Sequence, residues 1–213
     1  MSKVSVSILS NNIKPEIIVK DVNNSDADYI HLDIMDGKFV DNKTWSFNDI
    51  KKILKDNKKK LEAHFMVSNP LKYLDDYATL NLEYFIIHYE SVKNIDKIID
   101  KVKGYGLKVG ISIKPSTDVS VLFPYLKYID EVLIMSVEPG ASGQSFIYDS
   151  TNKIEILRKE IDKQNTSTII SVDGGINDET GKLCMDAGAH MLVSASFIHK
   201  NIKDNVMLLK NIK

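Results

Sequence analysis

The stretch Tyr29-Ile30-His31-Leu32-Asp33-Ile34-Met35-Asp36-Gly37 shows the unit from which the fold is built, a short β-rich apolar run that ends in polar side chains. Eight such runs occur along the chain, with helix-like segments between them. This alternation is typical of a parallel sheet with helical crossovers. The candidate strands span residues 4–9, 28–34, 61–66, 84–88, 108–113, 131–135, 168–173 and 190–193.

The count of eight strands decides between two parallel-sheet folds. A doubly wound open sheet would show the same alternation, but its dinucleotide-binding form carries G-x-G-x-x-G after the first strand. Residues 10–13 read Ser-Asn-Asn-Ile instead. A length of 213 residues lies at the lower end of the range for closed barrels. We therefore predict an α/β fold, a (β/α)8 barrel that forms one domain over residues 1–213.

Two helices of this barrel can be placed in more detail. The segment 70–79 is predicted to be helical, with Asn69 as its N-cap and Pro70 in the first position. The segment 149–163 is predicted to lie against the sheet through the apolar residues Ile154, Ile156, Leu157 and Ile161. Three glycines lie where helices should end before the next strand, namely Gly104, Gly106 and Gly188.

Composition narrows the class of partner. Twenty-eight basic and 29 acidic residues give a formal net charge of -1, which provides no overall attraction to nucleic acid or anionic lipid. No apolar run approaches the roughly 20 residues that span a bilayer. The single cysteine, Cys184, and the lack of a signal-like start favour the cytoplasm. We expect a small-molecule partner. The lysine-rich stretch 51–60 is better interpreted as a solvated helix end than as a phosphate site.

Four polar residues at predicted strand ends suggest a metal site. His31 and Asp33 are two residues apart, so strand periodicity points both side chains to one face. His64 and Asp173 lie near the ends of two other strands. Alone, a strand histidine is more often a hydrogen-bonded core residue, and Asp173-Gly174-Gly175 could be a simple turn. Together, two imidazoles and two carboxylates suit zinc or another divalent first-row metal.

Glycine-rich loops after the last three predicted strands suggest a phosphate site, because barrels commonly hold phosphate there. The loop after the sixth strand contains Gly140, Ser142, Gly143 and Gln144. Gly174-Gly175 follows the seventh strand, and Ala195-Ser196 follows the eighth. Glycines let backbone N–H groups approach a ligand closely. Capping of the last helix is an equally good interpretation of Ser196.

These motifs resemble those of the ribulose-phosphate 3-epimerase family. The resemblance rests on His31-Leu32-Asp33-Ile34-Met35-Asp36-Gly37-Lys38-Phe39-Val40, Ala63-His64-Phe65-Met66-Val67, Met135-Ser136-Val137-Glu138-Pro139-Gly140, Gly143-Gln144-Ser145-Phe146 and Val172-Asp173-Gly174-Gly175-Ile176, in that order along nearly the whole chain.

The resemblance implies a (β/α)8 barrel with one divalent ion (zinc, iron or manganese) at His31, Asp33, His64 and Asp173. It also implies that Asp33 and Asp173 are the acid/base pair. Four further residues would surround the substrate, namely Ser7, Met35, Met66 and Met135. The chain differs from the family pattern in Ala195 for a glycine, in Ala141-Ser142 of the phosphate loop, in Lys114-Pro115-Ser116-Thr117 for a motif beginning with asparagine, and in Asp41 for a proline.

The implied reaction is the epimerisation of a phosphorylated ketose at the carbon beside its carbonyl, in the pentose phosphate pathway. D-ribulose 5-phosphate and D-xylulose 5-phosphate are the leading substrates. The alternatives are a six-carbon ketose phosphate such as D-allulose 6-phosphate, a phosphate-binding barrel decarboxylase, and a metabolite-binding barrel without catalysis. Association into a homo-oligomer stays open, because no patch in the sequence identifies an interface.

Overall fold

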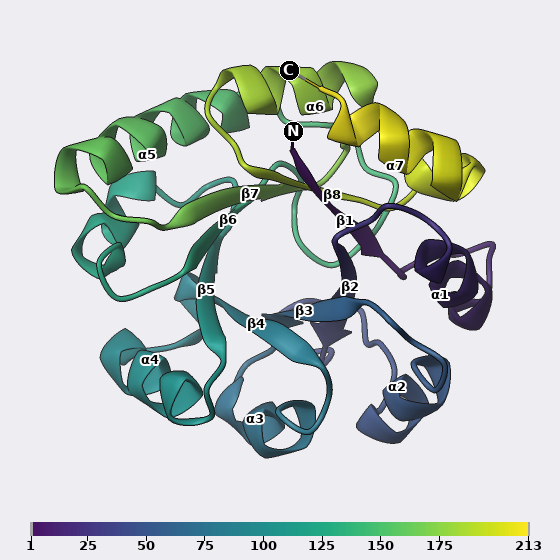
Figure 1. Ribbon diagram of the computed structural model, residues 1–213. Coiled ribbons are helices and arrows are strands. Elements are labelled where there is room, and N and C mark those ends of the chain that lie inside the picture. Colours follow the sequence, from purple (N-terminus) through teal and green to yellow (C-terminus); the bar gives the residue numbers. More distant parts are fainter. Residues whose placement is uncertain (1, 213) are drawn as a thin grey trace.

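A computed structural model describes residues 2–212. Eight parallel strands pair in chain order, and the last strand pairs with the first, which closes the barrel (Figure 1). The predicted (β/α)8 barrel is confirmed. Both ends of every predicted strand lie within two residues of the ends of the observed strand. The strands are β1 (Lys3–Ser7), β2 (Tyr29–Met35), β3 (Lys60–Met66), β4 (Leu82–His88), β5 (Lys108–Ile113), β6 (Glu131–Met135), β7 (Ile169–Asp173) and β8 (Met191–Ser194).

Helices surround the barrel on the outside (Figure 1). The α-helices among residues 2–212 are α1 (Pro15–Asn23), α2 (Phe47–Ile53), α3 (Leu71–Tyr77), α4 (Ile95–Gly104), α5 (Ser150–Gln164), α6 (Asp178–Asp186) and α7 (Ile202–Lys210). Short 3-10 helices are η1 (Tyr89–Ser91), η2 (Val119–Tyr125) and η3 (Ile198–Lys200). The crossover between β5 and β6 thus consists of η2 instead of an α-helix. Pro124 lies inside η2 and has no N–H to extend an α-helical hydrogen-bond ladder.

The structure corrects two details of the predicted helices. Asn69 does not cap α3, because Pro70 is the N-cap residue and the backbone carbonyl of Asn69, not its side chain, accepts from the Lys72 N–H. In α5, the side chain of Ile156 is 48% exposed. The buried residues of α5 include Ile154, Leu157 and Ile161. Their spacing of three and four residues defines one helix face, and Ile156 lies outside it.

The predicted helix-ending glycines are confirmed. Gly104 is the last residue of α4, and Gly106 and Gly188 adopt φ angles of +74° and +109° just beyond α4 and α6. A positive φ is accessible to glycine at little cost, so the chain can leave each helix toward the next strand.

The two larger apolar clusters among residues 2–212 leave one end of the barrel free for a site. The larger cluster lies between the sheet and the helices and includes Val4, Leu32, Phe85 and Leu157. A smaller one fills the barrel interior, where the aromatic rings of Tyr29 and Tyr84 pack edge to face. Because the interior is packed in this way, a ligand has to enter at the loops after the strands.

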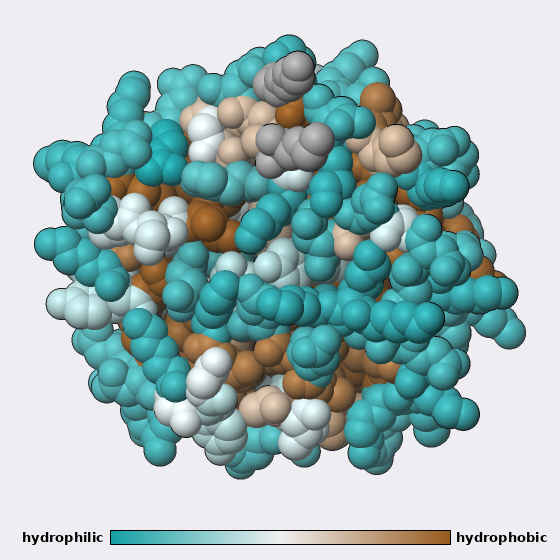
Figure 2. All heavy atoms as spheres, in the orientation of Figure 1, coloured by the Kyte–Doolittle hydropathy of each residue, from teal (hydrophilic) through white to brown (hydrophobic). Residues whose placement is uncertain are grey.

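The outer surface is mainly polar. The face in Figure 2 is largely hydrophilic, with hydrophobic residues in seams between polar side chains. Most residues of the lysine-rich stretch 51–60 are exposed, as expected for a solvated helix end and loop. No helix within residues 2–212 has the length and apolar character needed to cross a membrane.

Candidate active site

The four predicted metal ligands converge at the carboxyl ends of three strands. His31 and Asp33 come from β2, His64 from β3 and Asp173 from β7, and one potential ligand atom of each lies within 4.8 Å of the others. Strand periodicity accounts for His31 and Asp33, and the parallel register pairs Asp33 with His64. The two imidazoles are fully buried.

The distances inside this cluster suit an ion better than direct hydrogen bonds. His31 Nε2 lies 3.4 Å from Asp33 Oδ1 and 3.8 Å from Asp173 Oδ2. His64 Nδ1 lies 3.7 and 3.9 Å from the same two oxygens. Ligands in a tetrahedral zinc site are about 3.4 Å apart, since each is about 2.1 Å from the metal. His31 Nε2 and His64 Nδ1 are buried and have no hydrogen-bond partner among residues 2–212. The residues present therefore fit a divalent ion.

Outer contacts orient two of these side chains. Glu62 Oε1 lies 2.6 Å from His31 Nδ1, so the ring can donate there and direct Nε2 at the cluster. The Ser7 hydroxyl donates to Asp33 Oδ2 over 2.7 Å, which leaves Oδ1 facing the imidazoles. These contacts thus orient His31 and Asp33 toward the centre of the cluster.

The environment separates the pKa values of the two aspartates. Burial alone would raise the pKa of Asp33, but His31 and His64 outweigh it and lower that pKa well below its usual range. At Asp173, burial outweighs the attraction of His31, and the negative charge of Asp33 adds to it, so the pKa is raised. The two carboxyl groups therefore differ in how readily they hold a proton, the arrangement that acid/base pairs use.

The two imidazoles also differ in charge. Burial lowers the pKa of His64 to about 3, so its ring is neutral. Burial would also lower the pKa of His31, but the carboxylates of Asp33 and Glu62 outweigh it and raise that pKa. A metal ion could bind His31 only after its Nε2 proton has left.

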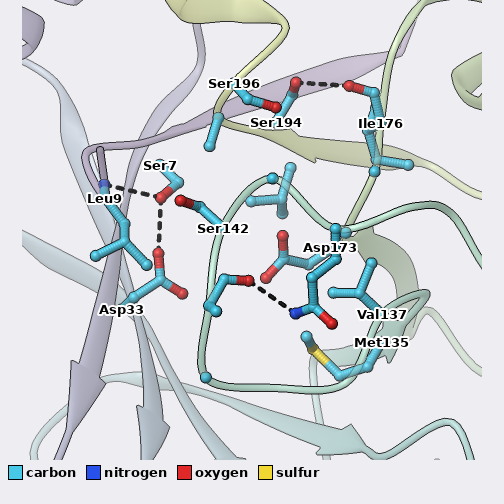
Figure 3. A pocket seen from close by; sticks show the side chains of 18 of the residues that line it. Ser7, Leu9, Asp33, Met135, Val137, Ser142, Asp173, Ile176, Ser194 and Ser196 are labelled. Atoms are coloured by element: carbon cyan, nitrogen blue, oxygen red, sulfur yellow. Dashed lines mark hydrogen bonds between the residues drawn. The ribbon is translucent and has the colours of Figure 1, made fainter. Parts of the chain in front are cut away.

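A pocket lined by Asp33 and Asp173 opens at the cluster. Asp33 and Asp173 approach it from different strands, with Ser7 beside Asp33 (Figure 3). The four residues predicted around the substrate and the eight predicted at the phosphate site all line the pocket, namely Ser7, Met35, Met66, Met135, Gly140, Ser142, Gly143, Gln144, Gly174, Gly175, Ala195 and Ser196. The structure brings them together, and their roles in binding stay predictions.

Hydrogen bonds fix the loops on the side of the predicted phosphate site. The Ser136 hydroxyl donates to the backbone carbonyls of Asp173 and Gly174, and that of Ser194 donates to the carbonyl of Ile176. Ser196 does not cap α7, whose N-cap is Asn201. Ser196 instead lines the pocket, where it could contact a ligand.

Sequence reasoning missed two neighbours of the cluster. Glu62 contacts His31, and His88 Nε2 lies 2.8 Å from His64 Nε2. Glu62 lies two residues before His64, so the alternation that linked His31 to Asp33 could have found it. His88 ends a predicted strand, which is the position where the other site residues were sought.

Comparisons with known proteins show the family of the chain. The sequence model of the ribulose-phosphate 3-epimerase family matches residues 3–199. A ribulose-phosphate 3-epimerase of Chlamydia muridarum is 34% identical over 197 residues, 90% of this chain and 86% of that relative. One from Bacillus subtilis is 35% identical over 201 residues, 93% of each chain.

A solved phosphoribosylanthranilate isomerase from Thermotoga maritima is similar in fold, with a TM-score of 0.69. It is 16% identical, and the match covers 99% of this chain and 97% of that one. At this identity the similarity bears on the barrel fold alone.

Proposed function

Because the chain belongs to the ribulose-phosphate 3-epimerase family, an isomerase family acting on carbohydrate phosphates, we propose that it interconverts D-ribulose 5-phosphate and D-xylulose 5-phosphate. The observation that carries this proposal is the cluster of Asp33, Asp173 and two imidazole nitrogens at the base of one pocket. Inversion at a carbon needs a proton acceptor on one face and a donor on the other. Two carboxylates whose pKa values are shifted in opposite directions can fill these roles.

His31, Asp33, His64 and Asp173 would hold one divalent ion, with zinc, iron and manganese as the candidates. Their two nitrogen and two carboxylate donors suit such an ion, and the carboxylates balance its charge. When bound, the ion supplies a Lewis acid that polarises the ketose carbonyl and stabilises the negative charge of the enediolate.

The two aspartates move the protons. Ionised Asp33 removes the proton from carbon 3, and the electrons of the C–H bond pass into the enediolate. Protonated Asp173 then donates its proton to the opposite face of the same carbon, which inverts it. Asp33 now holds a proton and Asp173 is ionised, so the reverse reaction starts from the exchanged state. The hydrogen bond from Ser7 holds Asp33 in the orientation that this step needs.

Other pocket residues would bind and cover the substrate. Backbone N–H groups near Gly143, Gly175 and Ser196 would bind its phosphate; these residues line the pocket on the loops where barrels hold phosphate. Met35 and Met66 lie together in a small apolar cluster and, with Met135, provide a polarizable cover that limits the entry of water. We place this activity in the cytoplasm, in the pentose phosphate pathway.

An isotope experiment on Asp173→Asn tests the two-base assignment. The variant, incubated with D-ribulose 5-phosphate in deuterium oxide, should gain deuterium at carbon 3 through Asp33 but form little D-xylulose 5-phosphate. Asp162→Asn is the matched control, because Asp162 is 67% exposed on α5. This control should invert at the wild-type rate.

Metal content has to be measured in the same samples. Substantial inversion by a metal-loaded Asp173→Asn variant would rule out Asp173 as the second acid/base. A coupled assay for D-xylulose 5-phosphate, with and without metal removal, tests the reaction itself. A parallel assay with D-allulose 6-phosphate tests the six-carbon alternative, and a higher kcat/KM for that substrate would reassign the specificity.

A further inference from the structure

A chain of buried hydrogen-bonding groups leads away from the candidate metal ligand His64. Its Nε2 atom lies 2.8 Å from His88 Nε2. On the other side of the His88 ring, Nδ1 lies 3.1 Å from Glu90 Oε2. Both imidazole rings are fully buried, so water does not compete for these contacts.

Metal binding at His64 Nδ1 would permit only one arrangement of protons along the contacts from His64 through His88 to Glu90. A metal-bound imidazole nitrogen carries no proton, so the proton of His64 must be on Nε2. His64 Nε2 then donates to His88 Nε2, which can accept only if the proton of His88 is on Nδ1. His88 Nδ1 therefore donates to Glu90.

Glu90 is well placed to end the chain as an acceptor. Its Oε1 accepts the backbone N–H of Lys114, at 2.8 Å, and the hydroxyl of Thr117. Burial would raise the pKa of Glu90, but hydrogen bonds from His88, Thr117 and Lys114 outweigh it and lower the pKa to about 2. The carboxylate is thus ionised and offers Oε2 to His88 as an acceptor.

A lysine fixes the loop that holds Glu90. Lys153 Nζ, on α5, donates to the backbone carbonyls of Lys114, Pro115 and Thr117. The contacts therefore run without interruption from α5, through the loop after β5, to Glu90.

We propose that His88 and Glu90 are positioning residues that hold His64 with its Nδ1 lone pair directed at the metal. This role rests on the metal site of the proposed function. His31 is oriented by direct contact with a carboxylate, Glu62. For His64 the carboxylate acts through an intervening imidazole, so its proton arrangement depends on two residues.

The substitution Glu90→Gln tests the role with little change in shape. The Gln carbonyl would face the two donors from Lys114 and Thr117, which turns its amide group toward His88 Nδ1. His88 then has to accept at Nδ1 and carry its proton on Nε2. That proton opposes His64 Nε2–H and drives the His64 proton to Nδ1, where the metal should bind.

The expected result is a zinc dissociation constant about 10- to 100-fold higher in Glu90→Gln, measured by competition with a chelating dye. Long-range proton–nitrogen NMR spectra of metal-free protein should show His64 protonated on Nε2 in the wild type and on Nδ1 in the variant. A merely structural role for Glu90 would not exchange these tautomers.

Two further variants complete the test. Glu83→Gln is the matched control on β4, the strand that ends at His88. Glu83 pairs with Lys60 and Lys108 away from the cluster, so this variant should keep wild-type zinc affinity and tautomers. His88→Gln places a carbonyl acceptor near His64 Nε2 and should bind zinc more tightly than His88→Leu, which offers none.

The outcomes separate this role from the proposed function. If the wild type binds zinc, and Glu90→Gln has the same affinity and the same tautomers, the role of Glu90 and His88 is refuted while the metal site stands. A wild-type protein that binds no divalent ion refutes the metal site and this role together.

Discussion

Removal of the proposed metal ion should lower the thermal stability of this protein. Within the described part of the chain, His31 Nε2 and His64 Nδ1 are buried and have no hydrogen-bond partner. Asp33 and Asp173 also lie close to each other in the same cluster. An ion that binds all four side chains in the folded protein, and not in the unfolded chain, stabilises the fold through mass action.

The size of this effect follows from chain length. At a free metal concentration 100 times the dissociation constant, the stabilisation is about 2.7 kcal/mol. Unfolding entropies of about 2.1 cal/mol/K per residue give about 0.45 kcal/mol/K for 213 residues. Dividing the stabilisation by the unfolding entropy predicts that metal binding raises the unfolding midpoint by about 6 °C.

The assay is calorimetry of metal-free protein in buffers of fixed free zinc concentration. The midpoint of His64→Ala should respond much less to zinc, because a ligand is gone. His190→Gln is the matched control, since His190 contacts Arg158 outside the cluster. Its absolute midpoint can differ, but its shift with zinc should equal that of the wild type. A wild-type midpoint that stays constant from nanomolar to micromolar free zinc would refute the metal site.

Three other predictions concern the pocket and the core. Gly175→Ala should impair both folding, measured by urea unfolding, and phosphate binding, measured by KM, more than Gly143→Ala does. The reason is that a Cβ at Gly175 would lie 2.7 Å from the backbone nitrogen of Phe146, whereas a Cβ at Gly143 would have no atom within 4 Å. Both φ angles are positive, so a cost of about 1–2 kcal/mol is common to the two variants and cancels in the comparison. Unphosphorylated ribulose should have a far lower kcat/KM than its 5-phosphate, and similar values would refute the phosphate site. Burial raises the pKa of Cys184 to about 12, so a thiol reagent should modify it only as the protein unfolds, and rapid modification of the native protein would contradict this burial.

Strand positions could be predicted from sequence because both faces of a barrel strand are buried. In β2 every residue from Tyr29 to Met35 is buried, so the strand appears in the sequence as a nearly continuous β-rich run. The polar exceptions within such a run, His31 and Asp33, stand out and have the spacing of one strand face. The fold and the histidine–aspartate cluster were therefore predicted from the same residues.

Helix details were harder to predict because helices here are buried on one side only. Ile156 is apolar yet exposed, so its hydrophobicity alone did not assign it to a face. Pro124 allowed a 3-10 helix where the regular alternation predicts an α-helix. Such features depend on how a segment packs on its neighbours, which hydrophobic periodicity does not determine.

The contact between His64 and His88 depends on an irregularity that no residue pattern in the sequence marks. In the pairing of β3 with β4, Leu61 lies opposite Leu82, but the next residue, Glu62, lies opposite Tyr84. The register thus skips Glu83. Neighbours in register point to the same face, and a slip of one residue exchanges the faces of a strand. Regular alternation from Leu82, which packs in the outer core, would direct His88 out of the barrel toward the helices. The skipped residue reverses this, so that His88 enters the barrel interior and can reach His64.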